Sequence, residues 1–559
     1  MARTYDRFLR QRLSRRRLLA GASATALGAA ALYACGGDGD GGGPRANVTG
    51  TPGPSPEGTP RSGGILHLRQ EVAYPNFNPF GPGINAIAQG LFLGFAIFDH
   101  FWYVPTDTGE VVKFLATDYE VIDAQTVRVT IGDAVFHNKP PVNGRKVVAS
   151  DVKTSAERFR EEVPLGFSWL QEVLDRIEIP DDKTVVYHQK RPWAWFFTSS
   201  NAGSPWTSSI LPEEILDRDD LLNDDAIGSG RWVLAGHDAG TNVRLRKFEH
   251  WREPGLPYLD GVYYVFAPDD TLAQAAFSAK DIDVLAGLNR EEQDALVNRF
   301  RDQIVTSSDL SRAYRCVMIK DEEPFRDPRV RQGISLAVDR QEMMQILDLG
   351  DGELSGPVPP AHKRYVLDEN DPDLQEYVRH YPAEAKAMLE GAGFPFDQET
   401  VLKYSDFQDA PDLAEVLAQQ LRRIGLKIKL PGAEPLPVWF TQTLIQGNFQ
   451  MTSFTHLPYE DPYLPMAFYL GSSTAGQPNP MGYKDDEVDE AILAAASELD
   501  EEQRIELTKD AQRLLIRKWA PMLNFYSPLT FVARWSYYKC TVEGRGSFGL
   551  FNSRSWLDK

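Results

Sequence analysis

The stretch PFRDPRVRQGISLAVDR, residues 324–340, predicts one well-delimited amphipathic helix. Asp327 stands where an N-cap carboxylate accepts the free N–H groups of the first turn, and Pro328 suits the first helical position. Four apolar residues then share one helical face: Val330, Ile334, Ala337 and Val338. The stretch therefore predicts a helix that begins at Pro328 and packs on a hydrophobic core.

A strand and a helix are predicted well ahead of that stretch. Val127, Val129 and Ile131 alternate with polar residues, as in a strand with one buried face. The next periodic segment predicts a helix with Ser150 or Asp151 as its N-cap, because apolar residues recur there at helical spacing.

The later part of the chain continues this alternation of helices and strands. A helix is predicted with the buried stripe Leu413, Leu417, Leu421 and Ile424. Gly425 ends it, and residues 426–430 then alternate as a strand. Residues 485–519 predict two helices broken near Asp500. The whole pattern predicts a mixed α/β architecture.

Composition bounds the class of protein. The chain has 559 residues, with 42% hydrophobic and 25% charged residues, which is ordinary for a globular protein. A body of this length is too long for one core, so two or three domains are expected. The net charge of −20 disfavours nucleic acid as a partner, because proteins that bind nucleic acids carry basic surfaces.

The N-terminal stretch SRRRLLAGASATALGAAALYACGG, residues 14–37, is typical of an export signal. Its arginines resemble a twin-arginine signal, and Leu32–Cys35 resembles a bacterial lipobox in which Cys35 carries lipid, although Tyr33 is bulkier than usual there. An uncleaved anchor with an incidental cysteine and plain secretion are the alternatives. All three place the body outside the cytoplasm, and lipid anchoring to the outer face of the membrane is our prediction.

Residues 36–62 contain almost no apolar side chains and are rich in Gly and Pro. Such a segment cannot bury enough surface to offset the entropy of ordering it. We therefore predict a signal over residues 1–35 and a disordered tether over 36–62. Beyond the signal, no second apolar stretch is long enough to span a bilayer.

The chain has three cysteines. If Cys35 carries lipid, Cys316 and Cys540 remain, and an extracytoplasmic protein can join such a pair in a disulfide. Twin-arginine substrates, however, are generally exported already folded from a reducing compartment. We therefore expect two buried free thiols rather than a disulfide.

Several segments together resemble family 5 of the extracellular solute-binding proteins, the peptide, nickel and oligosaccharide receptors of ABC importers. Among them are GSGRWVL, the opening stretch and HYPAEAKAMLEGAGF. The resembling segments follow the family's order and span nearly the whole body: residues 136–159, 228–234, 324–340, 380–394, 482–492 and 512–526.

The resemblance implies a two-lobed periplasmic-binding-protein-like α/β fold with mixed sheets, a hinge and an interlobe ligand pocket. The expected division is lobe 1 over residues 63–313, lobe 2 over 314–521 and a C-terminal return to lobe 1 over 522–559, with an inserted subdomain near 111–227. It also implies a monomer that captures a peptide or similar solute and passes it to ABC permease subunits, with no cofactor or metal.

The resemblance further implies that the loop after the first strand contacts the solute. Here this loop is EVAYPNFNPF, residues 71–80. Its candidate residues are Tyr74, Asn76, Phe77 and Asn78. The alternative is that Asn-Phe-Asn-Pro is only turn chemistry. Trp193 and Trp195 are further aromatic candidates.

The segment FTHLPYEDPYL, residues 454–464, departs from the family pattern. Peptide-binding members often read Trp-x-x-Asp-Tyr-x-Asp/Glu-Pro here, and the first aspartate pairs with the peptide's α-ammonium. Alignment on Pro462 puts Pro458 at that aspartate, which leaves recognition of a free amine in question because a buried ammonium needs a counter-ion. The candidates here are His456, Tyr459, Glu460 and Asp461. The acids can equally be turn residues, and the histidine can be packed in a core.

Other classes of function find little support in the residues. The body contains no Gly-x-Ser-x-Gly, His-Glu-x-x-His or Cys-x-x-Cys pattern, so the common hydrolase and zinc motifs are missing. A glycosidase carboxylate pair stays open, because acidic residues are abundant. The same fold serving as an oligosaccharide receptor or as a non-transport sensor also stays open.

Overall fold

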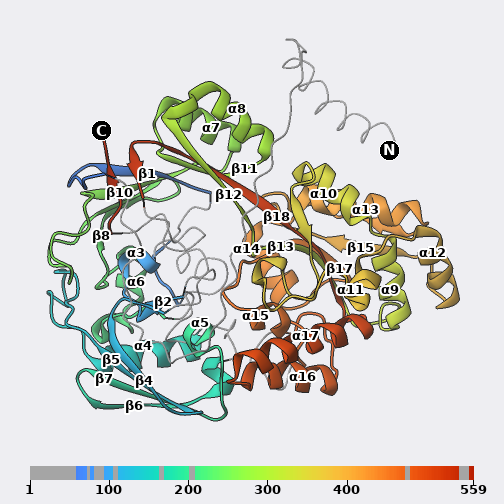
Figure 1. The fold of residues 1–559 in the computed structure, drawn as a ribbon, viewed down its shortest axis with the longest axis horizontal. Helices are drawn as coiled ribbons and strands as arrows, with labels where there is room; N and C mark the ends of the chain where they lie inside the picture. The colour runs from blue at the N-terminus through green and yellow to red at the C-terminus, as the bar shows by residue number, and fades with distance from the viewer. Residues whose placement is uncertain are drawn as a thin grey trace, which may run out of the picture. The chain divides into compact units, whose positions relative to one another are not determined.

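The structure is a computed structural model that describes residues 58–71, 76–80, 94–104, 111–162, 169–200, 208–471, 479–540 and 553–559 (Figure 1). All of these belong to one compact unit, Thr49–Lys559. In these ranges, no helix is both long enough and apolar enough to cross a membrane. Tyr74 and Cys35 lie outside the described residues. The described residues of 58–313 are called the N-terminal half below, and those of 314–521 the C-terminal half.

The largest sheet among the described residues has twelve strands. Ten of them follow the order β16-β15-β17-β13-β18-β11-β1-β10-β9-β8, and β12 and β14 also pair with β18. The N-terminal half contributes β1 (Ile65–Gln70), β8 (Trp232–Asp238), β9 (Asn242–Lys247), β10 (Gly261–Phe266), β11 (Val284–Leu288) and β12 (Ile304–Leu310). The C-terminal half contributes β13 (Tyr314–Ile319), β14 (Gly352–Leu354), β15 (Glu399–Lys403), β16 (Lys427–Lys429) and β17 (Met451–His456).

One long strand, β18 (Met522–Trp535), belongs to both halves of this sheet. Its residues 522–528 pair with β13 and β14, and its residues 529–535 pair with β11 and β12, all antiparallel. Figure 1 shows it as the red strand that runs from the β11–β12 side to the β13–β17 side. The main-chain ladder therefore passes without interruption from one half to the other.

A second sheet lies within the N-terminal half. Its four antiparallel strands have the order β4-β5-β7-β6: β4 (Ala116–Asp123), β5 (Thr126–Ile131), β6 (Leu174–Asp181) and β7 (Thr184–Gln189). Val127, Val129 and Ile131 are buried, so the alternation predicted for β5 is confirmed. Helix α4 (Ala149–Glu162) packs on β6 and β7. Helix α5 (Phe196–Ser199) comes after β7 in the chain.

Helices complete both halves (Figure 1). The N-terminal half has α3 (Phe95–Ile97), α6 (Asp219–Asp224), α7 (Asp270–Ala279) and α8 (Arg290–Phe300). The C-terminal half has α9 (Pro328–Ala337), α10 (Arg340–Asp348), α11 (Pro372–Val378), α12 (Pro382–Gly391), α13 (Ala410–Arg423), α14 (Leu436–Val438), α15 (Tyr463–Ala467), α16 (Asp486–Ser497) and α17 (Glu501–Arg517). Short strands are β2 (Trp102–Tyr103), β3 (Val112–Lys113), β19 (Tyr538–Lys539) and β20 (Trp556–Leu557).

The helix predicted from the opening stretch is confirmed as α9. Asp327 caps it by accepting the N–H of Arg329, and its apolar face is buried. Two arginines of the same stretch are also buried. Arg331 donates to the carbonyls of Phe325 and Trp519, and Arg340 donates to Ser335 and to the carbonyl of Asn524 on β18. The stretch thus connects α9 to the central strand through charged as well as apolar contacts.

Of two further helix predictions, one for a helix end is confirmed and one for a helix start is wrong. The helix ending at Gly425 is confirmed as α13, and Gly425 has a φ of +106°, which favours glycine. The N-cap predicted at Ser150 or Asp151 is wrong, because α4 already begins at Ala149. Asp151 instead lies in the first turn, and its carboxylate accepts the N–H of Val148, as in half of a capping box.

Both cysteines in the described ranges are free thiols, which confirms the preference against a disulfide. Cys316 is buried on β13, whereas Cys540 is half-buried. The prediction that both thiols are buried is therefore right for Cys316 only. The helices α16 and α17 match the predicted break, with Asp500 as the N-cap of α17.

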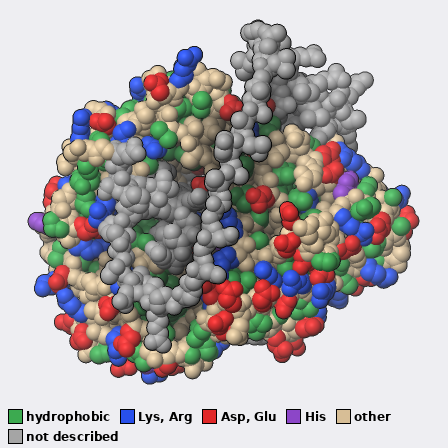
Figure 2. All heavy atoms as spheres, in the orientation of Figure 1, with side chains coloured by type: hydrophobic (Ala, Val, Ile, Leu, Met, Phe, Trp, Pro, Cys, Tyr) green, Lys and Arg blue, Asp and Glu red, His purple; other side chains and the backbone are tan. Residues whose placement is uncertain are grey.

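The surface of α16 and α17 carries closely mixed acidic and basic side chains (Figure 2). Arg364 pairs with Glu501 and Glu502, and Lys518 pairs with Asp485 and Glu487. The negative charges of this face are therefore interleaved with positive ones. The exposed pairs of Arg364 contribute at most about 1 kcal/mol each to stability.

Candidate functional site

The connection between β17 and α15 carries the two acids that the sequence singled out. Asp461 is 1% exposed. Its Oδ1 accepts the N–H groups of Tyr463 and Leu464, both at 3.1 Å, so it initiates α15. Its Oδ2 accepts the hydroxyl of Thr198 at 2.8 Å, which comes from α5 in the N-terminal half. Burial raises the pKa of Asp461 to about 6.

The neighbouring acid, Glu460, forms an ion pair with Arg312. Both side chains are 9% exposed. Arg312 precedes β13, so the pair fastens the β17–α15 connection to the entrance of the central sheet. The charge of a carboxylate paired in this way is balanced by its partner within the protein.

Removing one partner of this pair should cost much more than removing both. Arg312→Met is expected to lower the free energy of unfolding by about 3–5 kcal/mol, because it leaves the carboxylate of Glu460 buried without a counter-ion. The double variant Arg312→Met/Glu460→Leu should recover most of that loss. Urea unfolding of the wild type, both single variants and the double variant measures the coupling. Additive losses would contradict a coupled buried pair.

His456, at the end of β17, lies inside an aromatic cage. Its ring stacks on Tyr314 at a centroid distance of 4.8 Å and meets Phe454, Tyr459 and Phe468 at 4.5–5.3 Å. Its Nδ1 accepts the N–H of the next residue. Burial lowers the pKa of His456 to about 3, so the ring is neutral at physiological pH. Its surroundings are those of a core residue.

The segment that carries Trp193 and Trp195 binds the C-terminal half at three points. Trp193 meets Tyr463 edge to face at 4.7 Å between centroids. The N–H of Ala194 donates to the carbonyl of Ala496 on α16 at 2.9 Å. The guanidinium of Arg504, on α17, lies over the ring of Trp195 at 5.1 Å from its centroid. Both tryptophans are buried.

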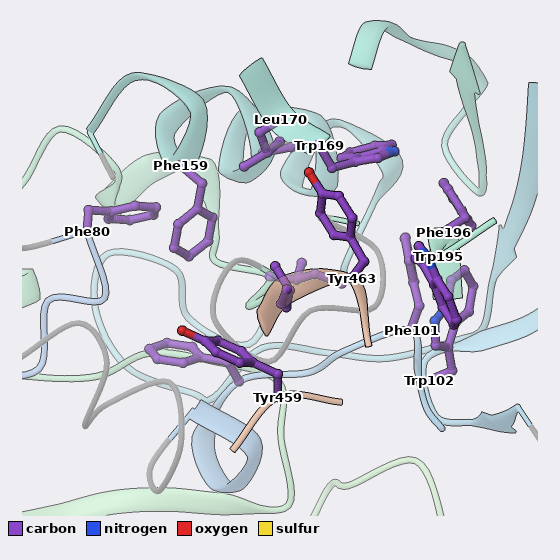
Figure 3. Close-up of a cluster of buried hydrophobic side chains, with 14 of the residues drawn as sticks. Phe80, Phe101, Trp102, Phe159, Trp169, Leu170, Trp195, Phe196, Tyr459 and Tyr463 are labelled. Atoms are coloured by element: carbon purple, nitrogen blue, oxygen red, sulfur yellow. The ribbon is translucent and has the colours of Figure 1, made fainter. Parts of the chain in front are cut away.

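Aromatic side chains from the two halves intermix around this segment (Figure 3). Figure 3 draws Tyr459 and Tyr463 together with rings of the N-terminal half, and Tyr463 points towards Trp169; the rings of that half are Phe80, Phe101, Trp102, Phe159, Trp169, Trp195 and Phe196. All of these side chains belong to one hydrophobic cluster. Aromatic surroundings with a few placed polar groups are the usual lining of solute sites.

The first predicted loop shows turn chemistry in its described residues. Asn76 Oδ1 accepts the N–H of Asn78 at 3.1 Å, and Asn78 Oδ1 accepts the N–H of Phe80 at 2.9 Å. Phe77 is buried and packs edge to face against His237. The alternative given above for the two asparagines, a pair of Asx turns, is therefore realised, and contact with a solute stays a prediction.

Sequence reasoning missed the partners of the two acids. Thr198 is 263 residues from Asp461 in sequence, and Arg312 is 148 residues from Glu460. Nothing in the local pattern around either residue marks it. The structure thus brings Trp193, Trp195, Tyr459, Glu460 and Asp461 to one junction. The described polar contacts of Asn76 and Asn78 lie within their own loop, and Phe77 packs against His237.

The described ranges hold no group of three or more His, Cys, Asp or Glu side chains that could bind a metal ion. The polar contacts described at the junction are hydrogen bonds, one ion pair between Arg312 and Glu460, and one cation–π contact. Such groups can hold and orient a molecule.

A family model described as bacterial extracellular solute-binding proteins, family 5, middle region, matches residues 110–477. Among curated relatives, the glutathione-binding protein GsiB of Salmonella typhi is 22% identical over 435 residues, which cover 74% of this chain and 80% of the relative.

Two solved structures share the fold. The peptide-bound periplasmic binding protein DppA from Helicobacter pylori superposes with a TM-score of 0.76 at 21% identity, covering 89% of this chain and 99% of that one. The binding protein AgaA from A. tumefacien R10, in complex with agropinic acid, gives a TM-score of 0.77 at 21% identity and the same coverage. The fold is therefore the two-lobed α/β fold of the periplasmic binding proteins, as predicted.

Proposed function

We propose, because the chain belongs to family 5 of the bacterial extracellular solute-binding proteins, that it captures an organic solute between its two halves and delivers it to an ABC permease. The observation that carries this proposal is the junction described above. Trp193–Thr198 meets the β17–α15 connection there, while β18 joins the two halves by a continuous ladder. A shared strand on one side and side-chain contacts on the other suit hinge closure.

The proposed mechanism is closure rather than chemistry. The family consists of receptors, and we propose no catalytic role, no cofactor and no metal for this chain. Affinity would come from aromatic contact plus a few hydrogen bonds, and a solute that touches both halves would favour the closed form. A monomer is proposed. The lobes correspond to residues 63–313 with 522–559, and to 314–521.

The proposed solute is a peptide or a similar organic molecule without a required free amine. Relatives named for glutathione and peptide binding support the peptide class, and the agropinic-acid complex of AgaA supports the alternative of a non-peptide solute. Both acids of the β17–α15 connection are committed inside the protein, Glu460 to Arg312 and Asp461 to Thr198 and α15.

Blocking the amine of a peptide should therefore change its affinity little. We expect N-acetylation of a bound di- or tripeptide to alter its dissociation constant by less than about threefold, because neither acid is available as a counter-ion. Calorimetric titration of free and acetylated pairs measures this. A loss of about thirtyfold or more on acetylation would overturn the assignment and point to an acid outside this connection.

The proposed location is the outer face of the membrane, through lipid on Cys35 after twin-arginine export. Cys35→Ala should move the protein from the membrane fraction to the soluble fraction or block its processing, because one lipid-bearing residue is removed. Fractionation and labelling with a radioactive fatty acid measure both effects. Cys540→Ala is the matched control, and unchanged labelling of Cys35→Ala would refute the lipoprotein proposal.

A further inference from the structure

A short segment of the N-terminal half is fastened to three separate elements of the C-terminal half. Ala194 bonds α16, Trp195 lies under Arg504 of α17, and Thr198 bonds Asp461 at the start of α15. We call this set the clasp: Ala194, Trp195 and Thr198 with Ala496, Arg504 and Asp461. Each of its contacts joins a residue of the N-terminal half to a residue of the C-terminal half.

The bond between Thr198 and Asp461 is the strongest polar link in the clasp. Its acceptor is a carboxylate that is 1% exposed, and hydrogen bonds to charged acceptors in such surroundings are stronger than neutral ones. The other oxygen of Asp461 holds two N–H groups of α15. The carboxylate is therefore held in place by main-chain groups of its own half.

The main-chain bond of Ala194 gives the clasp a built-in reporter. Its N–H donates to the carbonyl of Ala496, a residue of the other half, rather than within its own strand or helix. The amide can exchange with water only when that contact opens. Its exchange rate therefore measures how often the two halves separate at this point.

We propose that Thr198 is a positioning residue that holds the two halves together through Asp461, so that the closed form is populated before any solute arrives. The inference rests on the proposed function, since closure matters only if a solute is captured between the halves. A protein already biased towards closure needs less differential affinity from its solute to complete the shift. Thr198 thereby sets part of the affinity without touching the solute.

The test compares amide exchange in three variants of the solute-free mature protein. Thr198→Val removes the hydroxyl with little change in shape, and Thr198→Ser keeps it. Thr154→Val is the matched control, because the hydroxyl of Thr154 bonds the carbonyl of Ser150 within α4. We expect exchange at Ala194 to accelerate at least about tenfold in Thr198→Val, and to stay within about threefold of wild type in the other two.

The inference is overturned if Ala194 in Thr198→Val exchanges as in wild type. It is also overturned if exchange rises uniformly across the chain, since that would report lost global stability rather than an opened clasp. The measurement uses no solute, so its outcome is separate from that of the proposed function. A failure of the latter would appear as wild-type protein that binds no compound at all.

Discussion

Acidification from pH 7 to pH 5 is expected to remove a large share of the protein's stability. Burial lowers the pKa of four histidines to about 3: His100, His137, His362 and His456. In the unfolded chain each binds a proton near pH 6.5. Their stabilising contribution is therefore complete above pH 6.5 and is lost progressively as pH falls from there towards 3.

The expected slope is large because four protons are involved. Below about pH 5.5, each histidine should lower the free energy of unfolding by about 1.4 kcal/mol per pH unit, so the four together should lower it by about 5 kcal/mol per unit. Asp461 acts in the opposite sense. Its pKa is raised to about 6, so the folded protein binds a proton at Asp461 more readily than the unfolded chain does. Protonation of Asp461 therefore adds about 1 kcal/mol to the free energy of unfolding between pH 7 and 5.

Urea unfolding at pH 7, 6 and 5 measures this dependence. His456→Phe should reduce the slope by about a quarter, because its cage is aromatic and the substitution removes one titrating group. His188→Gln is the control, since His188 lies half-buried on β7. Stability that stays constant from pH 7 to 5 would show that the buried rings are not held neutral.

Gly228→Ala is expected to cost more than about 4 kcal/mol of stability, or to prevent folding. A Cβ at this position would lie 2.1 Å from the carbonyl oxygen of Ile97 on α3, which is main chain and cannot turn aside. The same glycine is bound twice to His137: its N–H donates to Nδ1 at 3.3 Å, and its carbonyl accepts the N–H of His137 at 2.8 Å. Any shift that relieves the clash therefore disturbs a buried histidine.

The matched control for this substitution is Gly391→Ala. Gly391 ends α12, and a Cβ there would meet no atom within 4 Å beyond its chain neighbours and the backbone of its own helix. Alanine should leave stability unchanged or raise it by up to about 1 kcal/mol. Soluble yield and urea unfolding of both variants decide the matter. Gly228→Ala within about 1 kcal/mol of wild type would mean that α3 and the glycine turn are not rigidly packed.

Local patterns predicted the elements of this fold well where a chemical signal was strong. The cap and proline that begin α9, the glycine that ends α13 and the alternation of β5 are each visible in a few consecutive residues. The start of α4 was misplaced because Asp151 acts from inside the first turn rather than ahead of it. A local pattern does not distinguish these two positions.

The site was less accessible to sequence reasoning for a physical reason. The β17–α15 connection was found because its residues depart from a familiar pattern. The partners that its acids contact, however, are Arg312 and Thr198, which lie far away in sequence. His456 is a similar case, since one letter does not show that four aromatic rings enclose it. Long-range pairing decides what these side chains are free to do.

The central claim, capture of a solute between the two halves, is tested most directly by hydrogen–deuterium exchange of the mature protein. The protein is measured alone and with each member of a panel of free and acetylated peptides, oligosaccharides, amino acids and metal chelates. At least one compound should slow exchange both in residues 193–198 and in the β17–α15 connection, because a solute that closes the halves shields both sides. Protection confined to one half, or no protection by any compound, would contradict the account.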